Sequence, residues 1–230
     1  RLGQERLARG QHAEAGDAFR AALKMRATPA QLGEARLGLA KSLAGMGEKS
    51  LALAQLRELL AAVPAPAVRV EAGIMAARLE RDQNQLAAAE TRLRRLLADP
   101  PMLLGPQERR QALDILAEAL QEQGQHAAAA GAVLRMAQDT PPHHLPDLGR
   151  RLAEAAAQAP SREIEPLFAQ AADPSLRAAL TLALAKARLR EGKMEQAEAD
   201  LNTLRQMPAA QPYLPLVQQL GQEMTQAQQV

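Results

Sequence analysis

The chain has 230 residues, with 28 Lys and Arg against 26 Asp and Glu, so its formal net charge at pH 7 is +2. This balance, with one Tyr, two Phe and no Trp, argues against a nucleic-acid binder, which carries a basic excess and often stacking aromatics. The lack of cysteine excludes disulfides and thiolate chemistry, and no apolar run approaches the ~18 residues of a membrane span.

Helix-forming residues dominate the chain. It contains 51 alanines and 37 leucines, but only 3 Ile, 6 Val and 6 Thr. Ala, Leu, Arg, Gln, Glu and Lys lose little side-chain entropy in a helix, whereas strands are built from β-branched and aromatic side chains. At 47% hydrophobic residues the chain is also too apolar for intrinsic disorder. The composition therefore predicts an all-α protein.

A short pattern recurs along the chain. A turn residue is followed five positions later by alanine and then by large apolar residues. The turn residues are Gly10, Gly47, Asn84, Gly124 and Gly192, and the alanines are Ala15, Ala52, Ala89, Ala129 and Ala197. Successive alanines are 37, 37, 40 and 68 residues apart, the last being twice 34. Because glycine readily adopts the left-handed conformation that ends a helix, each copy predicts a helix, a tight turn and a second helix.

The residues before and after this pattern also recur. A large residue beside a small one precedes most of the turns, which suits a helix that approaches its partner closely. These pairs are Leu2-Gly3, Leu39-Ala40, Leu116-Ala117 and Leu184-Ala185, with Ala76-Ala77 in the third copy. The second helices are expected to close at proline-containing stretches, which are Pro64-Ala-Pro66, Pro100-Pro101, Pro141-Pro142 and Met207-Pro208.

The combined pattern resembles the tetratricopeptide repeat (TPR), whose unit of ~34 residues has small residues where its two helices cross. The resemblance implies an all-α, right-handed α-solenoid of antiparallel helix pairs with about 13 helices, in which the first helix of each pair lines the concave side. We expect one domain over residues 1–230. Its repeats are expected at 1–29, 30–65, 66–104, 106–142 and 174–208, with a degenerate pair at 145–172 and a closing helix at 212–228.

No catalytic motif is present in the sequence. It has no phosphate-binding loop, dinucleotide fingerprint, zinc-protease motif or nucleophile elbow. We therefore expect no enzymatic activity, no catalytic residues, no cofactor and no metal. Ser161 and Ser175 are expected to cap helix starts. His143 and His144 could contribute to a metal site, but adjacent residues point in different directions, and a polar loop is the simpler interpretation.

The predicted concave face holds the candidate binding residues. Lys41, Arg78, Glu118 and Lys186 occupy one equivalent position on successive first helices, and Met75, Arg81, Glu122 and Arg190 lie nearby. Further residues predicted on this face are Glu34, Leu37, Glu71, Ile74, Gln111, Asp114 and Leu182. This mixture of charges and apolar anchors would suit an extended peptide or a partner helix. The alternative is a concave face that binds nothing specific.

The leading functional hypothesis is a non-enzymatic scaffold that binds a protein partner. The aromatic-poor repeats resemble those of bacterial envelope proteins that act in peptidoglycan-synthase activation, polysaccharide export or secretion assembly. This resemblance implies a periplasmic or outer-membrane-associated location, with the cytoplasm as the alternative. The chain starts at Arg1 rather than Met, which is compatible with an upstream signal peptide or lipid anchor. Two other hypotheses are a self-assembling structural scaffold, and thus a homo-oligomer, and a module of an exopolysaccharide secretion protein.

Overall fold

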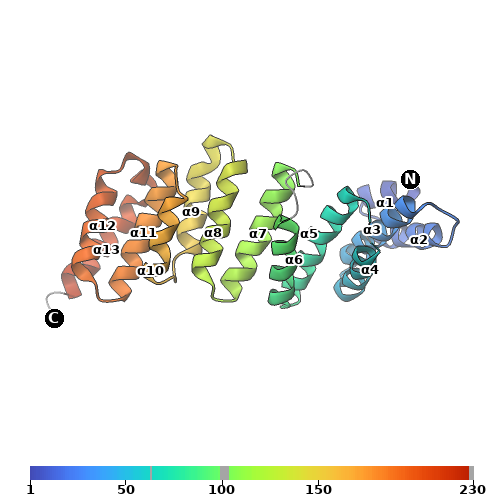
Figure 1. The fold of residues 1–230 in the computed structure, drawn as a ribbon, viewed down its shortest axis with the longest axis horizontal. Helices are drawn as coiled ribbons and strands as arrows, with labels where there is room; N and C mark the ends of the chain where they lie inside the picture. Colours follow the sequence, from blue (N-terminus) through green and yellow to red (C-terminus); the bar gives the residue numbers. More distant parts are fainter. Residues whose placement is uncertain (63, 99–103, 228–230) are drawn as a thin grey trace. The chain divides into compact units, whose positions relative to one another are not determined.

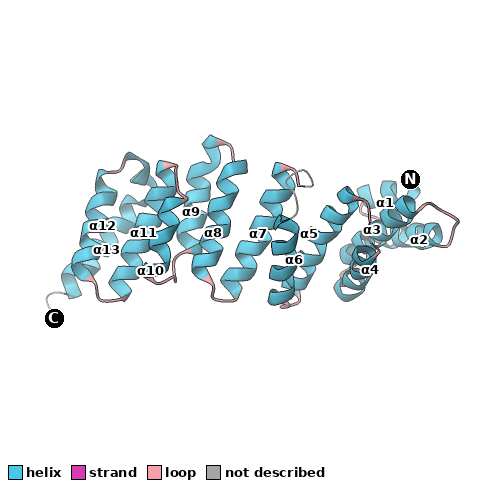
Figure 2. Ribbon diagram, viewed as in Figure 1, coloured by secondary structure: helices cyan, strands magenta, loops and turns pink. Residues whose placement is uncertain are grey.

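The structure is a computed structural model that describes residues 1–62, 64–98 and 104–227. These residues form thirteen α-helices with short 3-10 helices between them, and no strand occurs among them (Figure 2). The all-α prediction is therefore confirmed. Residues 1–115 and 116–230 form two compact units, called unit 1 and unit 2 here. The assignment of the whole chain to one domain stays a prediction.

The helices follow one another in pairs along the chain (Figure 1). Unit 1 contains α1 (Leu2–Ala8), α2 (His12–Leu23), α3 (Pro29–Gly45), α4 (Lys49–Ala61), α5 (Pro66–Asp82), α6 (Leu86–Ala98) and the first part of α7 (Pro106–Glu122). Unit 2 contains the rest of α7, α8 (His126–Met136), η2 (Ala137–Asp139), η3 (Pro142–His144), α9 (Leu145–Ala155), α10 (Ser161–Ile164), η4 (Glu165–Ala169), α11 (Pro174–Arg190), α12 (Met194–Gln206), η5 (Pro208–Tyr213) and α13 (Leu214–Ala227). Pro100, Pro101 and residue 228, which the sequence predictions use, lie outside the described residues.

The first helices α3 and α5 each pack between two second helices. In unit 1, α3 contacts α2 and α4, and α5 contacts α4 and α6. In unit 2, α11 contacts α9 and α12. The apolar core of unit 1 runs through several helices and includes Phe19, Leu43, Leu56 and Leu79. A core shared between neighbouring pairs stabilises repeats that could not bury enough apolar surface alone.

The predicted turn residues all have a positive φ. The angle is 73°, 82°, 75° and 73° at Gly10, Gly47, Gly124 and Gly192, and 58° at Asn84. Asparagine adopts this left-handed region more readily than most residues with a side chain, because its short polar group can hydrogen-bond locally. The placement of Asn84 at the same turn position as the four glycines is therefore confirmed.

The small residues of the pattern are completely buried. Ala15, Ala52, Ala89, Ala129 and Ala197 are all 0% exposed. The alanines of the recurring pairs that precede the turns are also 0% exposed. They are Ala40, Ala77, Ala117 and Ala185. In the first repeat, the ring of Phe19 fills the space beside Gly3 and Gly38, where a Cβ atom would overlap it. The sequence pattern therefore predicted the helix contacts as well as the helices.

The complete first helices share their length and their first residue. α3, α5, α7 and α11 each have 17 residues and begin at Pro29, Pro66, Pro106 and Pro174. Proline suits this position because its fixed φ is helical and its missing N–H would have no partner inside the helix. Pro66, expected to close a second helix, therefore starts the next first helix instead.

The segment at 145–172 departs from the regular pairs. The sequence predicts a second helix around Ile164, Leu167 and Phe168, but the structure has the four-residue α10 followed by the 3-10 helix η4. Pro166 lacks the N–H that would continue the α-helical hydrogen bonding, although Glu165 before it keeps α-helical dihedral angles, with φ −52° and ψ −45°. Both short elements contact α11.

One carboxylate in unit 1 is completely buried and paired. Glu80 on α5 is 1% exposed, and its oxygens accept hydrogen bonds from Nε and Nη2 of Arg92 at 2.8 and 2.7 Å. Arg57 on α4 adds a third bond at 3.3 Å. A buried charge is tolerated only when it is paired in this way. The cluster therefore links α4, α5 and α6.

The last helices of unit 2 pack through Tyr213, which is 5% exposed. Its hydroxyl group lies beside α9, where a Cβ atom at Gly149 would be 3.0 Å away. Burial raises the pKa of Tyr213. Through the part of the chain that the structure describes, no helix combines the length and the apolar character needed to cross a membrane.

Candidate functional site

The first helices of unit 1 line a groove of about 800 Å³. It is formed by α3, α5 and the start of α7, together with Gly105 just before α7. We call this hollow the α5 groove. Its lining residues are Lys41, Ala44, Ala67, Val70, Glu71, Ile74, Met75, Arg78, Leu79, Gly105, Glu108 and Gln111.

Three of the predicted binding residues meet in the α5 groove. Lys41 comes from α3, and Met75 and Arg78 come from α5. Glu71, Ile74 and Gln111, which the sequence places on the same face, line it as well. The repeat spacing brings these residues together because first helices of equal length lie side by side at α3 and α5.

The apolar part of the groove comes mainly from one side of α5. Val70 and Ile74 are buried beneath it, and Met75 is half-buried at its surface. Val70 was not among the predicted residues, although it lies one helical turn before Ile74 and therefore on the same side of the helix. This four-residue spacing is the sequence signal that could have identified it.

The charged groups of the groove have different partners. The ammonium group of Lys41 lies 2.5 Å from Oε1 of Glu71, so an ion pair links α3 to α5. Glu108, which sequence analysis missed, lies in the first turn of α7 with its carboxylate over Gly105. The amide dipoles at a helix N-terminus favour a carboxylate there. Within the described residues, the exposed Arg78 has neither an ion pair nor a side-chain hydrogen bond.

Arg81 lies outside the lining of the α5 groove. Its Nη2 atom is 2.9 Å from Oδ1 of Asp82, and Nζ of Lys49 is 2.9 Å from Oδ2 of the same carboxylate. Burial alone would raise the pKa of Asp82, but the hydrogen bonds from Lys49 and Arg81 lower it below its ordinary value. Arg81 is therefore engaged within the fold.

The other four predicted residues belong to unit 2. Glu118 lies 3.9 Å from Nη2 of Arg151 on α9, and Glu122 is exposed at the end of α7. Lys186 is half-buried on α11. Arg190, at the end of α11, donates to Oε1 of Gln158 at 2.7 Å and to the Ala159 carbonyl at 3.0 Å. Arg190 thus holds the loop before α10.

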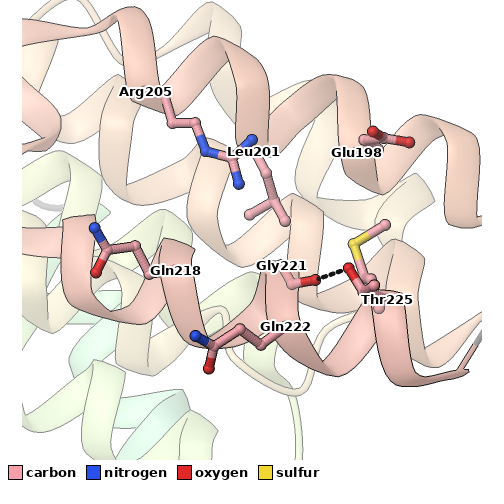
Figure 3. Close-up of a pocket in the computed structure, with 8 residues that line it drawn as sticks. Glu198, Leu201, Arg205, Gln218, Gly221, Gln222 and Thr225 are labelled. Carbon is pink, nitrogen blue, oxygen red and sulfur yellow. Dashed lines mark hydrogen bonds between the residues drawn. The ribbon is translucent and has the colours of Figure 1, made fainter.

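Unit 2 also has a smaller hollow between α12 and α13, of about 390 Å³ (Figure 3). Glu198, Leu201 and Arg205 line it from α12, and Gln218 and Gly221 are among its residues on α13. A Cβ atom at Gly221 would lie 3.1 Å from Nη2 of Arg205, so the absence of a side chain there leaves room for the guanidinium group. None of the predicted binding residues lies in this hollow.

Ser161 and Ser175, the expected helix caps, both donate hydrogen bonds to carboxylates. Ser161 is 2% exposed, its hydroxyl group donates to Oε2 of Glu191 at 2.6 Å, and its backbone N–H donates to Oε1 at 2.7 Å. Asp173 accepts from the N–H of Ser175 at 2.8 Å. The acceptors at these helix starts are therefore the carboxylates of Glu191 and Asp173, and the prediction that the serines are the caps is wrong.

The histidine pair lies in η3, with the two ring centroids of His143 and His144 4.1 Å apart. Nδ1 of His144 is 3.9 Å from a carboxylate oxygen of Asp147. Among the side chains that the structure describes, no group of three or more His, Cys, Asp or Glu residues could hold a metal ion.

Comparison with known proteins identifies the type of fold. No family model and no curated protein matches the sequence. The chain is similar to a crystal structure of nearly identical TPR-like repeats assigned to a kinesin light chain of Podosopora anserina, with 18% identity, a TM-score of 0.50, and 90% of this chain and 92% of that chain covered. LpoA of Haemophilus influenzae is also similar, with 18% identity and a TM-score of 0.48 over 85% of this chain. The chain spans 36% of the length of that LpoA. The fold is thus a TPR-like stack of helix pairs, as the sequence predicts.

Proposed function

We propose that this chain is a non-enzymatic protein-interaction scaffold that binds a segment of a partner protein in the α5 groove. The observation that carries the proposal is the convergence of Lys41, Met75 and Arg78, from two repeats, on one hollow of about 800 Å³. The TPR-like fold supports it, because stacked helix pairs present an extended surface for binding. A groove of this size suits a short peptide or one side of a helix.

The chemistry of the groove supports a peptide ligand in particular. Val70, Ile74 and Met75 supply apolar surface, and the flexible thioether of Met75 can adapt to different side chains. Lys41 and Arg78 place positive charge at the same surface. Burial of one or two apolar side chains would provide most of the binding free energy, and the charged groups would orient the segment.

The proposed setting is a complex of the bacterial envelope, in the periplasm or at the outer membrane. Its support is the resemblance of the aromatic-poor repeats to those of envelope proteins. Activation of cell-wall synthesis, polysaccharide export and secretion assembly are the processes that this setting would serve. Localisation of the tagged full-length protein by cell fractionation tests the setting independently of the groove.

Site-specific cross-linking tests the groove. A photo-reactive residue at Ala67, which is exposed and lines the groove, should capture the partner in cells, whereas the same residue at the exposed Ala54 on α4 should not. The variant Lys41→Glu/Arg78→Glu should abolish capture at position 67. The matched control, Lys24→Glu/Arg95→Glu, makes the same charge change at exposed positions of unit 1 outside the groove and should leave capture unchanged.

The helix content of all variants is compared by circular dichroism, so that loss of binding can be separated from unfolding. Capture only at Ala54, or equal capture by both charge-reversal variants, would move the binding surface to the second helices. Concentration-dependent sedimentation of the chain without capture at Ala67 would favour self-assembly instead.

A further inference from the structure

An ion pair links a residue of α3 to one of α5, but the corresponding described residues of α5 and α7 do not form one. α3, α5 and α7 have equal lengths, so equivalent positions can be compared directly. Lys41 and Arg78 are each the thirteenth residue of their helix, and Glu34, Glu71 and Gln111 are each the sixth. The sixth residue is therefore a carboxylate in α3 and α5 and a neutral amide in α7.

The thirteenth residue of α3 pairs with the sixth residue of the next first helix. The Lys41–Glu71 contact of 2.5 Å is this pair. One repeat further along, the equivalent residues are Arg78 and Gln111, and both line the α5 groove. Because an uncharged glutamine occupies position 111, Arg78 lacks the carboxylate that its counterpart Lys41 has.

The other acid of the groove does not supply this charge. Glu108 lies over Gly105 at the start of α7, and no ion pair joins it to Arg78 in the described part of the chain. Arg78 is exposed and is one helical turn from Ile74 and Met75. The groove therefore presents an uncompensated guanidinium group beside apolar surface.

We propose that Arg78 binds a side-chain carboxylate of the partner, and that the ligand of the α5 groove is an acidic segment with Asp or Glu next to a large apolar residue. The inference rests on the proposed function of the groove and specifies its ligand. Guanidinium and carboxylate groups form two parallel charge-assisted hydrogen bonds, which gives both strength and orientation. The partner's carboxylate would pair with Arg78 as Glu71 pairs with Lys41.

The substitution Gln111→Glu provides a direct test, because it would supply the missing intramolecular carboxylate while keeping Arg78 and nearly the same side-chain shape. Gln107→Glu is its matched control: it adds the same charge to the same helix at an exposed position outside the groove. Arg78→Gln removes the proposed anchor itself. All three replacements are at solvent-accessible positions, where substitutions usually change the free energy of unfolding little.

The probe is a random library of 12-residue peptides, acetylated and amidated so that their termini carry no charge. Peptides are selected on the full chain by cross-linking to a photo-reactive residue at Ala67. We expect selected peptides to be enriched in Asp or Glu beside Leu, Ile, Phe or Met. Loss of a charged hydrogen-bonding partner corresponds to roughly ten- to hundred-fold weaker binding. Arg78→Gln and Gln111→Glu should weaken the selected peptide by this factor, and Gln107→Glu should leave its Kd nearly unchanged.

The outcomes separate this inference from the proposed function. Peptides that cross-link at position 67 without acidic enrichment, or that bind Gln111→Glu as well as the original chain, would overturn the role of Arg78 and leave the groove as a binding site. A second library with free C-termini is selected in parallel. Selection from that library alone would contradict an internal acidic residue as the ligand and leave the groove as a binding site. Failure to select any peptide at position 67 from either library would overturn both.

Discussion

The α3–α4 pair of unit 1 and the segment from α9 to η4 of unit 2 are stabilised differently. In α3 and α4, Leu43, Leu56 and Leu59 are buried in the shared core. Between α9 and η4 the buried apolar residues are supplemented by polar contacts from the C-terminal end of α11. Arg188 lies 2.9 Å from Glu165, Arg190 binds the loop before α10, and Glu191 accepts two hydrogen bonds from Ser161.

This difference shows what the repeat signature encodes. The signature fixes turn residues and close helix contacts. The segment that lacks it still buries apolar residues such as Leu152 and Ile164, and adds polar partners from the end of α11. Such hydrogen bonds are directional and lie on few side chains, whereas apolar packing is distributed over many. The two regions should therefore respond differently to substitution and to pH.

The largest effect is expected in the core of the regular pair. Leu56 on α4 is 0% exposed, so Leu56→Ala removes apolar contacts and leaves a cavity. We predict a loss of about 2–5 kcal/mol in the free energy of unfolding, measured by urea denaturation. The conservative variant Leu56→Met should lose less than about 1.5 kcal/mol. Equal losses for both variants would argue against the cavity as the cause.

A smaller loss is expected at the turn of the same pair. Gly47 has φ of 82°, and a Cβ atom there would have no heavy atom within 4 Å. Gly47→Ala should therefore destabilise the protein by backbone strain alone, by about 1–2 kcal/mol. Gly131→Ala on α8 is the control, because that glycine has no positive φ and its new Cβ would meet its nearest neighbour, in Leu167, at 3.9 Å. We expect no loss there, since alanine favours helix.

The third repeat should respond in the opposite direction. Asn84 is held at φ 58°, where glycine has no steric penalty. Asn84→Gly should therefore relieve strain, and the greater flexibility of glycine in the unfolded chain should offset part of this gain. We expect a net increase in the free energy of unfolding of a few tenths to about 1 kcal/mol. A decrease would show that the asparagine side chain makes a stabilising contact at this turn.

The smallest effect is expected at the polar contacts of α10, and its dependence on pH is confined to the acid range. Hydrogen bonds from Lys193 and then Ser161 lower the pKa of Glu191 from 4.5 to about 2. Because the folded state holds the ionised carboxylate, its contribution to stability is complete above about pH 4.5 and is lost as the pH falls towards 2. The difference in unfolding free energy between the original chain and Glu191→Gln should be constant near neutral pH and shrink over this range. A difference independent of pH would contradict the assignment.

The sequence was informative where a position needs a particular kind of residue. Left-handed turns require Gly or Asn, and close crossings require Gly or Ala, so Asn84 and Ala15 could be placed from spacing alone. The convergence of Lys41 and Arg78 followed from the same spacing. Contacts to the segment that lacks the repeat spacing could not be predicted in this way. The binding of Arg190 to residues 158 and 159 and of Glu191 to Ser161 depends on the path of an irregular segment, which its prolines shorten into α10 and η4.

The buried Tyr213 has a consequence for spectroscopy. It is the only tyrosine of a chain without tryptophan, so near-ultraviolet absorption and fluorescence report on the packing of η5 against α11 in unit 2. Far-ultraviolet circular dichroism, in contrast, follows all helices of both units. If the two signals change together on heating, the protein unfolds in one cooperative step. If they change at different temperatures, unit 2 unfolds separately from the rest of the chain, and the two signals distinguish these steps without an added label.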